Sequence, residues 1–203
     1  MSTPFATASE RLNKEFINLS HIENLKVSLS YNGTNNFMNE DLYKGFHHAF
    51  LHQLAFEKMQ IASQYLKNNY PELKFLVFDA LRPRSVQVKM RKHVEHTPYK
   101  DYVADPKLGS LHNFGMAIDL TLIDKSEKEL DMGTPFDDFA ELAQPKLEEK
   151  FLREGLLTAA QMNNRMILRN TMLAGGFTQL PHEWWHYNAF ANDHVRKNFL
   201  IVE

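Results

Sequence analysis

The stretch LHNFGMAIDLTLI, Leu111 to Ile123, decides the fold, because it predicts a buried strand that is entered through a bend. From Met116 to Ile123, side chains alternate between a strongly apolar face and a second face that includes Asp119. His112 lies seven positions before Asp119, and a uniform strand would place the two side chains on opposite faces. The chain is therefore expected to bend between them, and Gly115 is the residue that permits a bend.

Other strands and helices are expected at irregular intervals on both sides of this strand. Sequence patterns predict strands at 25–31 and 74–80, and in FTQL and EWWHY near the C-terminus. Helical spacing predicts helices at 41–69, after Pro83, and at 158–174 before two glycines. Because the two types do not alternate regularly, we expect an α+β fold: a single domain over 1–203 with a largely antiparallel central sheet and flanking helices.

The composition limits which side chains could bind a metal, but it does not indicate a cellular compartment. The 203 residues include no cysteine, so any metal must be held by His, Asp or Glu. A net charge of -2 gives no reason to expect nucleic acid as a partner. The N-terminus lacks a basic segment followed by an apolar run, and no later stretch is long and apolar enough for a membrane span. We expect a cytoplasmic protein, or a periplasmic one if a signal peptide has been removed.

A second motif, PHEWWHYN from Pro181 to Asn188, contains the order H-E-x-x-H that zinc proteases carry on a helix. Its aromatic residues favour a strand, so His182 and His186 are not expected to share a helix face. We predict that His182 completes the string by chance and that His186 is the metal ligand. Taken alone, His112 and Asp119 are better explained as a hydrogen-bonded polar pair. Combined with His186 they form a two-imidazole, one-carboxylate set that leaves a fourth zinc position open for water.

Five segments together resemble a known family. SLHNFGMAIDLTL and EWWHY resemble the two zinc signatures of the VanX-type D-alanyl-D-alanine dipeptidases, in zinc peptidase family M15. FDALRP, DMGTPFD and YNGTNNF resemble three further segments of that family and occur in the same order. The resemblance covers most of the chain, from Tyr31 to Tyr187, and implies a fold like that of the Hedgehog domain and the D,D-peptidases.

The resemblance also implies a role for each matched residue. One Zn²⁺ per chain would be held by His112, Asp119 and His186. Glu183 would act as general base and acid, and Arg82 would stabilise the oxyanion of the tetrahedral intermediate. Three further residues would face the substrate: Tyr31, Ser110 and Asp137. Ser110 and Asp137 would lie near its free ammonium group. We expect Asp79 to orient Arg82 or to cap the turn that follows it.

The expected reaction is hydrolysis of the small molecule D-alanyl-D-alanine, and two alternatives remain. One is a zinc D,D-carboxypeptidase or endopeptidase that acts on peptidoglycan stem peptides. The other is a non-enzymatic, zinc-stabilised binding domain. That domain would need neither a base beside the metal nor a cation opposite it, and the sequence offers both in Glu183 and Arg82.

Overall fold

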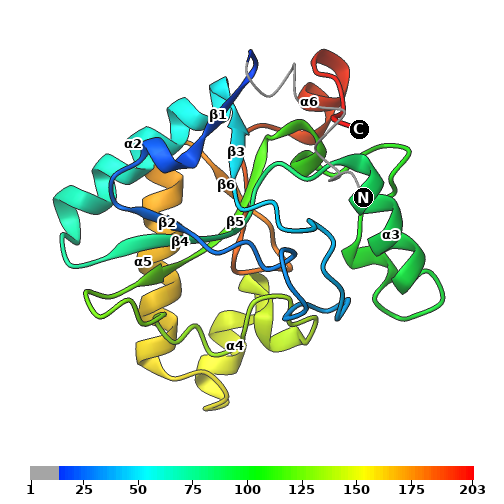
Figure 1. Ribbon diagram of the computed structural model, residues 1–203. Coiled ribbons are helices and arrows are strands. Elements are labelled where there is room, and N and C mark those ends of the chain that lie inside the picture. Colours follow the sequence, from blue (N-terminus) through cyan, green and yellow to red (C-terminus); the bar gives the residue numbers. More distant parts are fainter. Residues whose placement is uncertain (1–13) are drawn as a thin grey trace.

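A mixed five-stranded sheet forms the centre of the protein in the computed structural model, which describes residues 14–203 (Figure 1). In spatial order its strands are β2 (Leu25–Val27), β4 (Lys74–Asp79), β5 (Ala117–Ile123), β7 (His186–Asn188) and β6 (Thr178–Gln179). β2 and β4 are parallel, and the other three pairings are antiparallel. The prediction of an α+β fold with a largely antiparallel sheet is confirmed. The N-terminal stretch considered above for a signal begins in residues 1–13, outside the described residues.

β5 is the central strand, and its bend is the one expected from the sequence. All seven of its residues are buried. The chain enters it from a short 3-10 helix, η4 (Leu111–Phe114), through Gly115, whose φ of 64° is left-handed. Asp119 pairs with Asp79 on one neighbouring strand and with His186 on the other. Since directly paired residues point to the same face, this register places three ionisable side chains in a row across the sheet.

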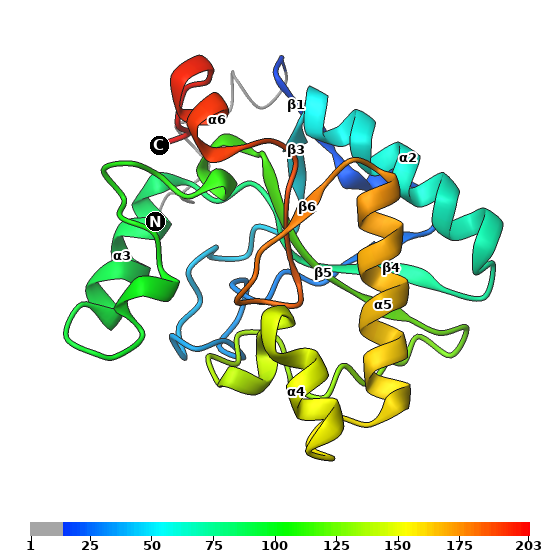
Figure 2. The ribbon, with the colours of Figure 1, turned by 180° about the vertical axis from the view of Figure 1, so that it is seen from behind.

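Helices surround the sheet, and two of them cover one of its faces. α2 (Gln53–Asn69) and α5 (Ala159–Ala174) lie side by side on this face; α5 is behind the strands in Figure 1 and in front of them in Figure 2. Their apolar faces form much of the core together with β4 and β5, through Met59, Ala62, Leu66, Leu168, Met172, Val77, Leu120 and Leu122. Thr158 and Gln161 form a capping box at the start of α5, so this helix has the predicted bounds.

Shorter elements complete the described chain. α3 (Arg84–Val94), α4 (Glu148–Arg153) and α6 (Asn192–Asn198) lie at its periphery (Figure 1). Short 3-10 helices occur at η2 (Leu19–His21), η3 (Lys100–Tyr102), η5 (Glu141–Ala143) and η6 (Pro145–Leu147). Within residues 14–203 no helix combines the length and the apolar character needed to cross a bilayer.

The helix predicted from residue 41 is wrong over its first part. Residues 50–52 form strand β3 (Phe50–His52), which pairs with β1 (Phe16–Asn18) in a small second sheet. The imidazole of His52 then caps α2 by accepting a hydrogen bond from the amide of Leu54. Pairing with a segment more than 30 positions away outweighs the local helical pattern here, because it satisfies the backbone of residues 50–52.

The EWWHY strand is also shorter than predicted. Only its last two residues belong to β7, while Glu183 is irregular and Trp184 and Trp185 form a bend. The doubt about a zinc-protease helix is confirmed, because no residue from Pro181 to Asn188 is helical.

Candidate metal centre and active site

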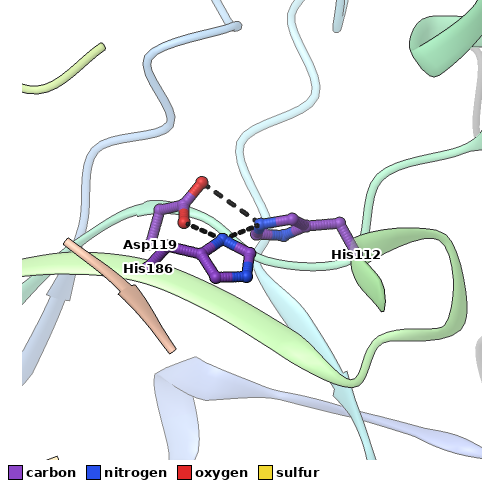
Figure 3. Close-up of side chains that lie close together, drawn as sticks. All are labelled: His112, Asp119 and His186. Atoms are coloured by element: carbon purple, nitrogen blue, oxygen red, sulfur yellow. Dashed lines mark hydrogen bonds and ion pairs between the residues drawn. The ribbon is translucent and has the colours of Figure 1, made fainter. Parts of the chain in front are cut away.

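Three side chains from η4, β5 and β7 converge on one point, as Figure 3 shows. His112 Nε2 lies 3.2 Å from His186 Nδ1 and 3.2 Å from Asp119 Oδ2. His186 Nδ1 lies 2.9 Å from Asp119 Oδ1. All three residues are buried, and their ligand atoms lie within 4.8 Å of one another. The bend at Gly115 and the pairing of Asp119 with His186 produce this convergence.

The outer nitrogen of each imidazole is held by an acceptor. His112 Nδ1 lies 2.7 Å from the carbonyl oxygen of Ala80, and His186 Nε2 lies 2.8 Å from Asn188 Oδ1. Because both partners accept hydrogen bonds, each outer nitrogen carries the proton. With the outer nitrogen held in this way, each ring turns its other nitrogen towards Asp119.

The cluster fits a metal ion. His112 Nε2, His186 Nδ1 and the Asp119 carboxylate oxygens face one another in a small buried space, an arrangement that a cation at the centre would stabilise. Ligand atoms about 2.1 Å from a tetrahedral zinc lie roughly 3.4 Å apart, close to the separations found here. Burial raises the pKa of Asp119, but His112 and His186 outweigh it and hold that pKa below its ordinary value. The carboxylate is therefore ionised and ready to bind a cation.

Glu183 is buried beside this cluster in the bend that precedes β7. One of its carboxylate oxygens, Oε2, lies 3.8 Å from His186 Nδ1. Burial raises the pKa of Glu183 to about 7, although the neighbouring His186 opposes the shift. A carboxylate with a pKa near neutrality can both accept and return a proton.

Arg82 lies next to the cluster and is held rigidly. Its Nε and Nη2 donate to Asp79 Oδ2 at 2.8 and 2.6 Å, and its Nη1 donates to Gln87 Oε1 at 2.9 Å. Asp79, which is fully buried, also accepts a hydrogen bond from Tyr43. Asp79 thus orients Arg82, one of the two roles expected for it. A guanidinium has five N–H donors, so Nη1 and Nη2 each retain one for a further acceptor.

The three residues expected to face the substrate line the same pocket. Tyr31 Oη lies 3.0 Å from both carboxylate oxygens of Asp137. Burial raises the pKa of Asp137 to about 8, assisted by the charge of Asp119. Ser110 caps η4, where its hydroxyl accepts from the amide of His112. All eight residues singled out from the sequence line this pocket: Tyr31, Arg82, Ser110, His112, Asp119, Asp137, Glu183 and His186.

His182 stands apart from the cluster. It is exposed, and its ring nitrogen lies 3.0 Å from Lys146 Nζ.

Several supporting residues were not predicted from the sequence. Tyr43 and Gln87 hold the Asp79–Arg82 pair, and no local pattern distinguishes either of them. Asn188 carries a usable signal, since it follows His186 by two positions and therefore lies on the same face of β7.

Comparison with known proteins shows which family the chain matches. A family model of peptidase family M15, described as D-ala-D-ala dipeptidase, matches residues 13–202. A D-alanyl-D-alanine dipeptidase of Escherichia coli (strain K12) is 36% identical over 115 residues, which are 57% of this chain and 54% of that protein. A D-alanyl-D-alanine dipeptidase of Synechocystis sp. is 26% identical over 148 residues, covering 58% of this chain and 60% of the relative. The matched segments thus span little more than half the length of either relative.

The family match runs over nearly the whole chain and includes every residue of the candidate site. We conclude that this chain belongs to the D-ala-D-ala dipeptidase family of the M15 peptidases.

Proposed function

We propose that this chain, acting as one domain, is a zinc dipeptidase that hydrolyses D-alanyl-D-alanine to two molecules of D-alanine. The observation that carries the proposal is the shared pocket. A metal-binding cluster, a carboxylate with a pKa near 7, an oriented arginine and a second, half-buried carboxylate all line it. The names of the two relatives and the family description support this choice of substrate.

The chemistry divides between the ion and the side chains. Zinc held by His112, Asp119 and His186 would supply a Lewis acid for the scissile carbonyl and a water acidified to a pKa of ~7. Glu183 takes a proton from the attacking water, whose oxygen bonds to the carbonyl carbon. As the C–N bond breaks, Glu183 delivers that proton to the leaving amine, and one water is consumed for each peptide bond.

Arg82 stabilises the negative charge that develops on the carbonyl oxygen. Its guanidinium is fixed before the substrate arrives, because Asp79 and Gln87 occupy three of its N–H groups. A preorganised donor needs no rearrangement as charge develops, and losing one such donor typically lowers kcat by ~10²–10³.

Asp137 and Tyr31 supply a site for the substrate's ammonium group. The half-buried carboxylate of Asp137 contacts the tyrosine hydroxyl, and an incoming ammonium would pair with it and restore its ordinary ionisation. An acylated amine carries no charge and could not form this ion pair with Asp137, which disfavours blocked or longer peptides.

The test is release of free D-alanine from D-alanyl-D-alanine by zinc-loaded protein. N-acetyl-D-alanyl-D-alanine serves as the blocked substrate, Glu183→Ala as the inactive variant, and His182→Ala as a matched neighbour outside the cluster. We expect the wild type and His182→Ala to release D-alanine from the free dipeptide alone, and Glu183→Ala to release none. Cleavage of a stem pentapeptide but not of the dipeptide would favour the carboxypeptidase. Full function in Glu183→Ala would favour the binding domain.

A further inference from the structure

The loop that carries Asp137 needs support from outside, because its backbone is unusual. Asp137 has a φ of 62°, in the left-handed region that residues other than glycine seldom occupy. The loop runs from Asp131 to Ala140, between β5 and the 3-10 helix η5, and Leu142 lies in η5 immediately after it. Apart from its contact with the Tyr31 hydroxyl, the position of the Asp137 carboxylate depends on what holds the two ends of the loop.

Arg165, on α5, holds both ends at once. Its Nε donates to the carbonyl oxygen of Met132 at 2.7 Å, and its Nη2 donates to that of Leu142 at 3.0 Å. Its Nη1 lies 3.3 Å from Glu148 Oε1, so the positive charge is paired. Arg165 is only 1% exposed and is not among the residues that line the pocket. Its contacts therefore reach the site through the loop.

Neighbouring side chains on the same face of α5 strengthen this attachment. Gln161 Nε2 donates to Asp131 Oδ2, and Asn164 Nδ2 donates to the carbonyl oxygen of Asp131, both at 2.9 Å. Positions 161, 164 and 165 share a helix face, so one turn of α5 is hydrogen-bonded to the first end of the loop, at Asp131 and Met132. Arg165 reaches from this turn to the second end.

We propose that Arg165 is a positioning residue, which sets the place of Asp137 and thereby the recognition of the substrate's ammonium group. This inference rests on the function proposed above. A guanidinium is required, because its planar fork donates in three fixed directions to Met132, Leu142 and Glu148. A lysine ammonium would keep the charge opposite Glu148 but has a single nitrogen, which cannot reach both carbonyls in the same geometry.

The experiment compares Arg165→Lys, Asp137→Asn and the double variant, with Arg153→Lys as a control at an exposed arginine of α4. For Arg165→Lys we expect KM for D-alanyl-D-alanine to rise by about tenfold. The value of kcat should change less than about threefold, because the Arg165 clamp, its hydrogen bonds to Met132 and Leu142, does not include the metal cluster or Glu183. In the Asp137→Asn background the same change should raise KM no further, since both act through one contact. Arg153→Lys should match the wild type.

Three results would overturn the proposal: a fall in kcat of Arg165→Lys as large as its rise in KM, an unchanged KM in that variant, or a full second increase of KM in the double variant. Amide hydrogen exchange gives a readout without substrate: exchange should speed up at residues 133–141 of Arg165→Lys and stay unchanged in β5. If the wild type releases no D-alanine, the proposed function fails on its own. The positioning role is then judged by exchange, and unchanged rates in the loop would refute it.

Discussion

Gly115→Ala should destabilise the protein strongly, because Gly115 forms the bend between two of the three candidate metal ligands. A methyl group at this position would lie 2.7 Å from Phe16 Cε1 and 2.8 Å from the backbone nitrogen of His52. That nitrogen donates a 2.9 Å hydrogen bond to the Gly115 carbonyl oxygen, so the backbone cannot move away without weakening it.

Two terms set the expected magnitude. Alanine in a left-handed conformation is disfavoured by roughly 1–2 kcal/mol. Overpacking against atoms that cannot relax adds roughly 1–3 kcal/mol. Gly155→Ala is the matched control, because Gly155 has a φ of 72° but no atom within 4 Å of the added methyl group. Gly155→Ala should therefore lose only the roughly 1–2 kcal/mol for alanine in a left-handed conformation.

The assay is thermal unfolding of both variants with and without zinc. For a chain of about 200 residues, the overpacking term should lower the Tm of Gly115→Ala by roughly 2–12 °C below that of Gly155→Ala. Zinc should also raise the Tm of Gly115→Ala less, because the strained bend displaces the His112 side of the cluster. Equal Tm values and equal zinc responses in the two variants would refute this reasoning.

Three further predictions follow from the site. Asp119→Ala should lose zinc on dialysis and His182→Ala should keep it, as measured by elemental analysis; the reverse result would overturn the ligand assignment. Zinc-free Asp137→Asn should be more stable than the wild type at pH 7, by on the order of 2–4 kcal/mol in chemical denaturation. Below the unfolded-state pKa of ~4 the carboxyl is protonated in both states. As pH rises towards the folded-state value of about 8, only the unfolded chain gains from ionisation, so the wild type loses stability and the difference should vanish near pH 4. Asp79→Asn should lower kcat by roughly tenfold or more at unchanged zinc content, because Arg82 loses its ion pair; an unchanged kcat would show that Asp79 does not position the arginine.

Local patterns predicted the elements that rest on local physics. The buried strand at β5, the short apolar strand at β4 and the capped helix α5 were all expected from side-chain alternation, apolar runs and terminal residues. The start of α2 was not, because pairing of β3 with β1 joins segments far apart in the chain. Strand pairing between distant segments has no signature in a local window of sequence.

The sequence by itself determined the chemistry available to this protein. Without cysteine, a metal site had to use histidine and carboxylate, and the motifs around His112, Asp119 and His186 identified which ones to consider. Glu183 was predicted from the H-E-x-x-H string beside His186, and Arg82 from the resemblance of FDALRP to the family.

Only the tertiary structure decided how these groups are held. The register that pairs Asp119 with both Asp79 and His186 is a property of the whole sheet. The acceptors behind each imidazole, the Tyr43 contact with Asp79 and the Arg165 clamp on the Asp137 loop join residues that the fold brings together. Their hydrogen bonds depend on distances and directions in space, which the spacing of residues along the chain does not encode.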